Sequence, residues 1–501
     1  MRRTRSNVPC SPLLILSIGG MLTIWCKPAW PQSVLQYHFS ANRAGNYVIP
    51  NLTAEHARSI HLDNAFDGRV DGHIYAQPLL FTENARQLLI IATENDVVDA
   101  LDARTGRPIW QRSLGPAVKS WMLPCGNIDP LGITGTPAID PSRRAIYLDA
   151  LVMTNEGPQH LIFGLSLQKG EVLPGFPVNI AHALAGSGFQ FVPRYQNQRG
   201  ALLIIGNRVY IPYGGHFGDC GQYHGWVVGV GLAPPHRATA WNTSAAGGGV
   251  WAPAGIVSDG HSLFIATGNT FETREWAGGE AVIRLSPNLE PPKSTRDYFT
   301  PSDWHRLDGR DADLGGTAPI PLTLSDSSAT THLMLALGKD GKAYLLNRDN
   351  LGGVGGALTT LEVSRGEIKT APAAYPAADG GALVAFAAEW LNCPKPASNP
   401  SIGALRLQVL PQPSISAAWC APLDGGGVPI VTTTDGRSNP IVWIVGAEGD
   451  ERLHAFRGET GEPLLTVPQV ELKGLRRFAA IVATEERIFV PSDGRVYAFT
   501  P

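Results

Sequence analysis

A short run of the chain, 306–316, contains three carboxylates. It reads RLDGRDADLGG and carries Asp308, Asp311 and Asp313 between glycines. Alternating acids in a glycine-rich loop supply the hard oxygen ligands that calcium prefers, but the spacing and terminal glutamate of an EF-hand are absent. The sequence therefore favours a solvated acidic loop, with calcium binding as the alternative.

A second group of metal-ligating residue types lies in the run GGHFGDCGQYHGW. His216, Cys220 and His224 offer two imidazoles and a thiol. Such groups bind transition metals, yet their spacing fits no zinc-site pattern. We favour hydrogen bonds within the loop, because Cys220 is expected to be oxidised.

The cysteines beyond the first thirty residues form an even set of four, which allows three pairings: Cys125, Cys220, Cys393 and Cys420. The last two lie on neighbouring predicted strands, and the first two lie in long loops. We predict the disulfides Cys125–Cys220 and Cys393–Cys420, with the other pairings left open. The sequence contains no CxxCH motif, so an attached haem is not expected.

The amino-terminus is typical of an export signal. Basic residues in MRRTR precede an apolar run, 12–26, that is short and interrupted for a membrane span. We predict a signal peptide over 1–32 and a mature chain over 33–501, periplasmic or extracellular, with no membrane span after cleavage. The alternatives are a retained anchor or lipidation of Cys26, although bulky Trp25 stands where a lipobox needs a small residue.

Composition indicates one large folded unit. The 501 residues are 44% hydrophobic and include 56 glycines and 40 prolines, whereas charged residues make up 17%. Such a chain can bury a large core and is rich in turn formers. The net charge of −3 and the lack of basic runs give no electrostatic basis for nucleic-acid binding. We expect a monomer.

A unit of roughly 40 to 60 residues repeats along the mature chain, a period typical of propeller blades. Its clearest copy, 75–115, reads as four antiparallel strands and ends in a DARTG turn followed by Trp110, which we expect in the core. Six more copies follow, and the seventh includes 463–468 as its outer strand.

The eighth copy has only three strands before Pro501. An exposed edge is avoided in propellers by closing the ring, so we predict that 60–69 supplies the missing strand. The predicted fold is all-β: a single eight-bladed β-propeller of four-stranded antiparallel blades, closed by an amino-terminal strand.

The motifs between Trp251 and Asp349 resemble the central blades of quinoprotein alcohol dehydrogenases, propellers that hold pyrroloquinoline quinone (PQQ) over calcium. They are WAPAGIVSDG, ATGN, TPSDW and GKDGKAYLLNRD, in the family's order. The DARTG–Trp110 motif is similar to that of PQQ-type blades, where the indole packs between blades. The mature chain as a whole resembles secreted bacterial PQQ-like β-propeller repeat proteins without an established activity.

The resemblance implies a site. Trp251 matches the tryptophan that stacks beneath the quinone, Asn269 the calcium-binding asparagine, Asp303 the general base, and Lys339 the cation on the quinone oxygens. These roles suit the chemistry, because a flat electron-poor ring stacks on an aromatic one and calcium prefers hard oxygen ligands. A carboxylate can remove the proton of an alcohol.

Each of the four residues also has a structural explanation. Trp251 could pack at a strand end, and Asn269 could bond its own backbone in a turn. Asp303 could cap a helical turn, and Lys339 could be a solvated residue of a hairpin.

Two departures weaken the resemblance. The family's calcium-binding glutamate follows a GGaE motif, whereas this chain has His216 and Phe217 there, and Asp219 could substitute only if its loop folds inward. The family's adjacent cysteine pair is represented by Cys125 alone.

Two functions therefore compete. The favoured one is an exported propeller with a partly matched quinone and calcium site, which binds a small molecule or an envelope protein or polysaccharide. The alternative is a PQQ- and calcium-dependent dehydrogenase that oxidises an alcohol or a sugar.

Overall fold

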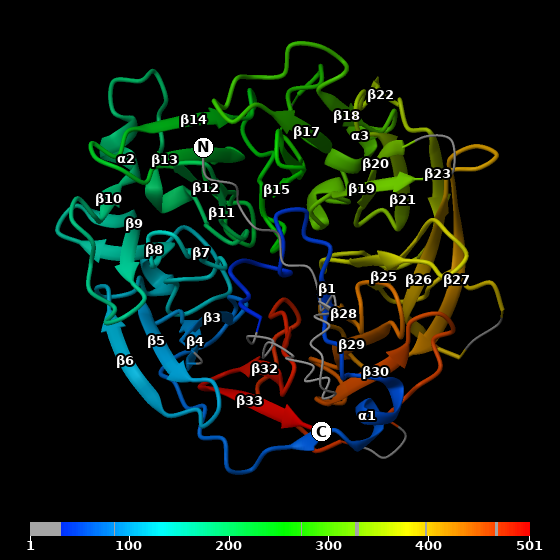
Figure 1. The fold of residues 1–501 in the computed structure, drawn as a ribbon. Coiled ribbons are helices and arrows are strands. Elements are labelled where there is room, and N and C mark those ends of the chain that lie inside the picture. Colours follow the sequence, from blue (N-terminus) through cyan, green and yellow to red (C-terminus); the bar gives the residue numbers. More distant parts are fainter. Residues whose placement is uncertain (1–31, 85, 272, 326–329, 396–397, 466–468) are drawn as a thin grey trace, which may run out of the picture.

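The computed structural model describes residues 32–84, 86–271, 273–325, 330–395, 398–465 and 469–501. Eight sheets form the blades of a ring around a central channel (Figure 1). The predicted all-β, eight-bladed propeller is confirmed. The predicted signal peptide lies outside the described residues except for Gln32. No helix of the described part is long and apolar enough to cross a membrane.

Blades one to four each contain four strands in chain order, from the channel outward. Their strands are β3 (Leu79–Glu83), β4 (Arg86–Ala92), β5 (Val97–Asp102) and β6 (Pro108–Ser113); β7 (Ala138–Asp140), β8 (Ala145–Thr154), β9 (Gly157–Ser166) and β10 (Val178–Asn179); β11 (Leu203–Ile205), β12 (Arg208–Tyr213), β13 (Trp226–Gly231) and β14 (Ala238–Asn242); and β15 (Val257–Ser258), β16 (Leu263–Thr267), β17 (Ala281–Leu285) and β18 (Tyr298–Thr300).

Blades five and six follow the same plan, and blades seven and eight each borrow one strand from the amino-terminus. The strands are β19 (Ile320–Ser325), β20 (Thr330–Leu337), β21 (Lys342–Asn347) and β23 (Thr359–Glu362); β24 (Ala373–Pro376), β25 (Ala382–Ala387), β26 (Pro400–Gln408) and β27 (Ser414–Pro422); β28 (Ile430–Thr433), β29 (Ile441–Val445) and β30 (Leu453–Arg457) with β1 (Asn46–Val48); and β31 (Val482–Ala483), β32 (Ile488–Ser492) and β33 (Arg495–Thr500) with β2 (His61–Leu62).

The remaining elements are short. Strand β22 (Gly353–Val354) adds to the outer edge of blade four, parallel to β18. The helices are α1 (Ala54–Ser59), α2 (Ile180–Leu184) and α3 (Trp304–Asp308), and the 3-10 turns are η1 (Ser120–Met122), η2 (Pro193–Tyr195) and η3 (Leu314–Gly316).

Tryptophans on outer strands tie neighbouring blades together. Trp110 of blade one donates a hydrogen bond to the Leu167 carbonyl of blade two (2.9 Å). Gly170 leaves room for that indole, because a Cβ there would lie 2.5 Å from it. Trp419 of blade six bonds the Gly458 carbonyl of blade seven in the same way (2.6 Å). The predicted packing of Trp110 between blades is confirmed.

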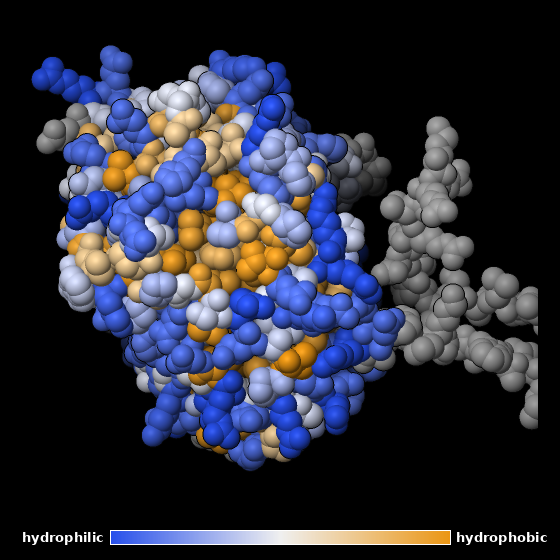
Figure 2. Space-filling model, turned by 90° about the vertical axis from the view of Figure 1, so that its left-hand side faces the viewer, coloured by the Kyte–Doolittle hydropathy of each residue, from blue (hydrophilic) through white to orange (hydrophobic). Residues whose placement is uncertain are grey.

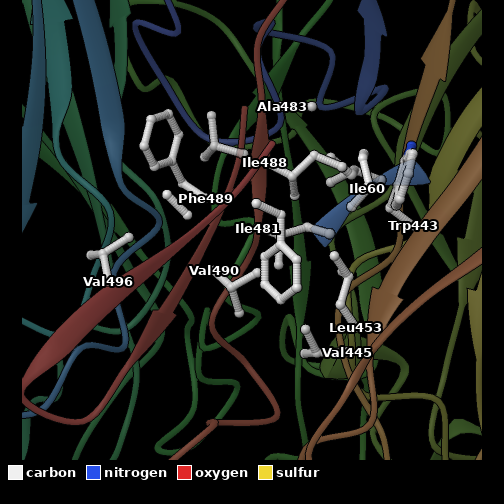
Figure 3. Packing of buried hydrophobic residues seen from close by; sticks show 14 of the residues in the cluster. Ile60, Trp443, Val445, Leu453, Ile481, Ala483, Ile488, Phe489, Val490 and Val496 are labelled. Atoms are coloured by element: carbon white, nitrogen blue, oxygen red, sulfur yellow. The ribbon is translucent and has the colours of Figure 1, made fainter. Parts of the chain in front are cut away.

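The ring closes where the sequence predicts. Strand β2 pairs with β33, and beyond it the Val496 amide donates to the Gly68 carbonyl (2.7 Å). Buried apolar side chains such as Ile60, Trp443 and Phe489 fill the seam between blades seven and eight (Figure 3). The closing strand is therefore held by backbone pairing and by a shared core.

Blade seven differs from the prediction for its outer strand. The segment 463–468 was expected to form it, but only Pro463 bridges Phe456, and the Leu464 amide donates to the Ala455 carbonyl. Proline has no amide hydrogen to extend a ladder, and 466–468 lie outside the described residues. The fourth strand is instead β1, which runs parallel to β28.

The segment 33–48 passes through the centre of the ring (Figure 1). Its backbone bonds the inner strands of blades one, two, four, six and seven in turn. The contacts are Val34 with Leu80, Leu35 with Ile139, Ala41 with Ser258, Ala44 with Ala374, and β1 with β28. The amino-terminal segment thus fills part of the channel.

Arg43 anchors this segment. Its buried guanidinium donates to the carbonyls of Tyr37 (3.0 Å), Leu202 (2.8 Å) and Ile256 (3.2 Å). Burial lowers the pKa of Arg43 to about 9, because the charged form loses its hydration. The side chain joins the segment to blades three and four without a carboxylate partner in the described part of the chain.

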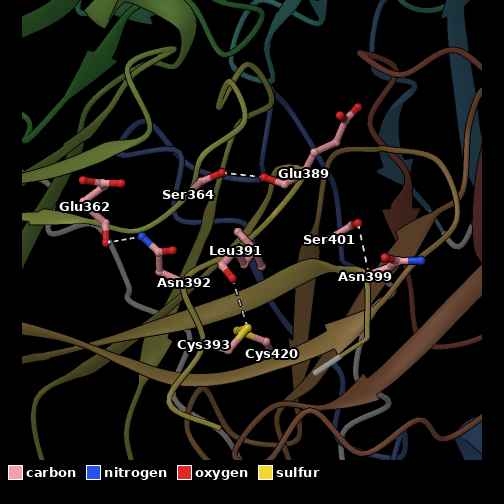
Figure 4. Close-up of a disulfide and its surroundings, with 9 residues drawn as sticks. All are labelled: Glu362, Ser364, Glu389, Leu391, Asn392, Cys393, Asn399, Ser401 and Cys420. Carbon is pink, nitrogen blue, oxygen red and sulfur yellow. Dashed lines mark hydrogen bonds between the residues drawn. A yellow bond between two sulfur atoms is a disulfide. The ribbon is translucent and has the colours of Figure 1, made fainter. Parts of the chain in front are cut away.

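Both predicted disulfides are confirmed. Cys393 joins the loop after β25 to Cys420 on β27 (Figure 4). Cys125 joins the loop between blades one and two to Cys220 in the loop between β12 and β13. Seen from the side of β6 and β10, the outer wall exposes apolar side chains bordered by charged ones (Figure 2).

We predict that Arg43→Ala lowers the free energy of unfolding by about 3 kcal/mol, since three buried carbonyls lose their donor at roughly 1 kcal/mol each. Urea unfolding followed by tryptophan fluorescence measures this. The exposed Arg58→Ala is the control. Equal stability of the two variants would contradict a role for Arg43 in holding the channel segment.

Candidate functional site

One end of the ring, here called the mouth, carries the segments between blades and the loops joining second to third strands. Trp251 lies before β15, Asn269 follows β16, Asp313 precedes η3, and Lys339 follows β20. Because strands of antiparallel blades alternate in direction, these segments share one end of blades four and five. Three of the four predicted site residues meet there.

Asp313, which the sequence placed in the acidic loop and not among these four residues, joins them. Its side chain is buried and accepts hydrogen bonds from Trp251 Nε1 (3.0 Å) and the Asn269 amide (3.0 Å). Lys339 Nζ lies 2.9 Å from Asp313 Oδ2 and 2.7 Å from Asp311 Oδ1. The same ammonium lies 5.2 Å from the centroid of the Trp251 ring, a cation–π distance.

The cluster requires a close approach of its segments. A Cβ at Gly268 would lie 3.0 Å from Trp251 Nε1 and 3.2 Å from the Asp313 carboxyl. A larger residue at 268 would press on both side chains. The neighbouring Asn269 is 8% exposed, and no hydrogen bond reaches its side-chain amide from the described residues. Among Trp251, Asn269 and Lys339, the Asn269 side chain is thus the one without a hydrogen bond to the described residues.

Asp303 is not brought to the cluster. It precedes α3, where its carboxylate bonds Arg306 and lies 3.6 Å from Lys342 Nζ. Its side chain is 35% exposed. Asp303 lies at the start of the helical turn α3, which agrees with its structural explanation, although its side chain makes no capping hydrogen bond. The carboxylate beside Trp251 and Lys339 is that of Asp313.

The expected solvated acidic loop is wrong for two of its three acids. Asp308 accepts hydrogen bonds from the Thr270 amide (2.9 Å) and hydroxyl (2.8 Å), and Asp313 is 2% exposed. Asp311 alone of the three is solvated as expected, since 64% of its side chain is exposed. The turn through η3 draws Asp313 inward toward Lys339.

Glu280 is a second buried carboxyl that sequence reasoning missed. Its Oε2 accepts the Leu314 amide (2.7 Å), whereas Oε1 has no hydrogen-bond partner in the described chain. Burial, and then the charge of Asp313, raise the pKa of Glu280 well above its usual range. A glutamate after two glycines and directly before a buried strand was the available signal.

The protonation of the cluster follows from burial. Burial raises the pKa of Asp313, while the Lys339 ammonium lowers it. Burial disfavours the charged form of Lys339, but the attraction of Asp313 and Asp311 outweighs burial and raises the pKa of Lys339 to about 12. Lys339 is therefore a cation at neutral pH, and burial favours the protonated form of Glu280.

The residues do not fit a calcium ion. His216 replaces the expected glutamate and bonds the Arg194 carbonyl (3.1 Å), and burial lowers its pKa to about 4. Asp219 accepts the Tyr223 hydroxyl (2.6 Å), and that ring packs on Gly215. Both oxygens of Asp313 are already used. No group of three His, Cys, Asp or Glu residues suited to a metal occurs in the described ranges.

The histidines near Cys220 make hydrogen bonds to loop carbonyls, which agrees with the favoured interpretation of the sequence. His216 bonds the Arg194 carbonyl, and His224 Nδ1 lies 3.0 Å from the Thr243 carbonyl oxygen. Cys220 is engaged in a disulfide.

The cluster also has groups that suit a planar quinone. Trp251 is partly exposed and offers an aromatic surface, and the Lys339 ammonium, which is bonded to Asp311 and Asp313, lies beside it. An open groove of about 680 Å³ adjoins the cluster through Thr270 and Asp308. Its volume is in the usual range for small-molecule sites.

Comparisons place the fold among known propellers. No family model matches the chain, and no curated protein matches it. The quinohemoprotein alcohol dehydrogenase of Comamonas testosteroni superposes with a TM-score of 0.63 at 15% identity, over 93% of this chain and 80% of that one. A europium-containing methanol dehydrogenase gives 0.64 at 12% identity, over 94% and 98%.

A third similar structure is BamB from Moraxella catarrhalis, with a TM-score of 0.51 at 13% identity, over 88% of this chain and all of that one. At such identities the likeness shows the fold alone. The chain therefore has the eight-bladed fold of the quinoprotein alcohol dehydrogenases.

We predict that Asp313→Asn lowers the free energy of unfolding by about 3 kcal/mol, because Lys339 loses its buried partner. The matched Asp303→Asn should change it by less than about 0.5 kcal/mol, since that carboxylate makes only exposed ion pairs. Urea unfolding at pH 7 separates the two. The reverse order of effects would show that Asp303, not Asp313, holds the site.

A buried carboxyl of blade one gives a pH prediction. Glu94 accepts the Gly132 amide (2.8 Å), and burial raises its pKa from 4.5 to about 7, although Gly132, Arg199 and Arg476 oppose this. The folded state therefore holds a proton that the unfolded state has released. This stability is complete below pH 4.5 and is lost as the pH rises through 7.

Glu94→Gln should consequently reduce the loss of stability between pH 5 and pH 8 by about 2 kcal/mol. Thermal unfolding at both pH values, with the exposed Glu171→Gln as control, measures it. An unchanged pH dependence in Glu94→Gln would mean that Glu94 is ionised in the folded protein.

Proposed function

We propose that this chain is an exported, monomeric propeller that binds a planar anionic ligand of the PQQ type at the mouth, against Trp251 and Lys339 and without calcium. The observation that carries the proposal is the buried Asp313 carboxylate, which holds Trp251 Nε1 and Lys339 Nζ together. A partly exposed indole beside a fixed ammonium suits a flat, negatively charged ring.

Export is supported by the two disulfides, which persist in oxidising compartments, and by the expected signal peptide. The similar fold of a quinohemoprotein alcohol dehydrogenase favours the same kind of ligand. A bound quinone would supply a two-electron acceptor.

The residues of this chain would bind and orient such a ligand. Lys339, held by Asp313, would hydrogen-bond its oxygens in exchange for the bonds to the exposed Asp311, and Trp251 would pack on its face. The Asn269 backbone amide bonds Asp313, the residue that holds Trp251 and Lys339, so the side-chain amide of Asn269 lies beside that cluster. Calcium-dependent oxidation of an alcohol or sugar is less well supported, because Asp303 lies outside the cluster and the metal ligands do not fit.

The test is a titration of the mature protein with PQQ in EDTA, followed by tryptophan fluorescence. We predict saturable quenching that weakens at least tenfold in Trp251→Ala and in Lys339→Met, a loss expected for one charge-assisted contact. Trp390→Ala removes an exposed indole and is the control.

Binding that is unchanged in both site variants would contradict the proposal, as would the absence of saturable binding. In the latter case the propeller would serve to bind an envelope protein or polysaccharide.

A further inference from the structure

Arg199 is a cation without a partner. It lies between η2 and β11, and its guanidinium has no hydrogen bond and no carboxylate within ion-pair distance in the described ranges. The guanidinium interacts electrostatically with Tyr75 and Glu94 but makes no hydrogen bond to either of them. Arg199 is half-buried, and burial lowers the pKa of Arg199 against the opposing charges of Tyr75 and Glu94. A half-buried guanidinium without an ion pair leaves its donors available to an anionic ligand.

Arg199 faces a cavity of about 150 Å³ at the mouth. The lining comes from the segments that precede blades one, two, three, four and eight and from the β29–β30 loop. The charged residues of the lining are Arg199, Arg476, Arg477 and Glu448. Blades four and five, which carry Lys339 and Asp313, contribute only Pro253.

The other two arginines of the cavity are already paired. Arg476 donates to both oxygens of Asp493 (2.8 and 2.7 Å) and to the Tyr75 hydroxyl (3.1 Å). Arg477 lies 3.0 Å from Glu448 Oε2. Arg476 and Arg477 are therefore each neutralised by a bonded carboxylate, whereas Arg199 has only the unbonded carboxyl of Glu94 near it, whose pKa is raised to about 7.

The size of the cavity limits the ligand. A cavity of about 150 Å³ holds a molecule near the size of benzene, which is smaller than a tricyclic quinone. Guanidinium groups bind carboxylates through two parallel hydrogen bonds, a geometry that suits a planar anion. The cavity thus suits a small organic acid of about four to six carbons.

We propose that the mouth contains a separate binding site in which Arg199 binds the carboxylate of a small organic acid. The site goes beyond the proposed quinone function, because its charged residues belong to other blades than Trp251 and Lys339. The buried neighbours Gln198 and Gly200 fix the backbone that presents Arg199.

The experiment is isothermal titration of the mature protein with succinate, with its neutral analogue succinamide, and with inorganic phosphate. We expect saturable binding of succinate and at least tenfold weaker binding of succinamide and phosphate. Arg199→Gln should weaken succinate binding at least tenfold, and Arg199→Lys should restore part of it. Arg194→Gln, an exposed arginine on the same segment, should bind as the wild type does.

Three outcomes would overturn the proposal: no succinate binding, equal binding by Arg199→Gln, or phosphate binding as tight as that of succinate. Circular dichroism and urea unfolding of each variant exclude misfolding as the cause. Trp251→Ala should bind succinate normally, so that failure of the quinone proposal and failure of this one are distinguishable.

Discussion

The structure depends on one constraint: a ring of sheets is stable only when its last edge is paired. Strand β2 supplies the pairing to β33, and the chain reaches that place only after crossing the channel. The crossing segment packs beneath the mouth, where Tyr37 contacts the buried cluster that includes Ala252 and Ala254. Arg43 bonds the Ile256 carbonyl just beyond it. Closure of the ring and support of the Trp251 segment are therefore one structural arrangement.

Above this support, burial determines the chemistry of the mouth. Asp313 is an acceptor for two segments and the partner of one cation, so its oxygens are used within the protein. Burial and the charge of Asp313 raise the pKa of Glu280 well above its usual range. Asp313 and Glu280 are thus bonded within the protein, and the partly exposed ring of Trp251 lies beside the Lys339 ammonium that Asp311 and Asp313 hold. The fold alone does not determine the chemistry of this site.

Much of the fold could be predicted because it repeats. The period of the strands, the turn before Trp110 and the truncated last copy follow from local patterns that each blade must satisfy. The channel segment could not be predicted, because 33–48 bonds a different blade every few residues and has no period. The parallel pairing of β1 with β28 leaves no mark on the sequence either.

The side-chain cluster at the mouth, as distinct from its function, was predicted in part for a similar reason. Trp251, Asn269 and Lys339 lie at strand ends, whose place in a blade is fixed by the repeat. The carboxylate of the cluster lies in an irregular connection, where η3 places Asp313 beside Lys339 and Asp303 lies elsewhere. Arg199 carries no motif, and its unpaired state depends on loops from several blades.

If the mouth binds an organic anion without a metal, calcium should not change its affinity for PQQ. The direct measurement is the PQQ dissociation constant of the wild-type protein in EDTA and in excess calcium. We expect the same constant in both. A constant at least tenfold lower in calcium, with the difference lost in Asn269→Ala, would contradict it and establish a metal site at Asn269.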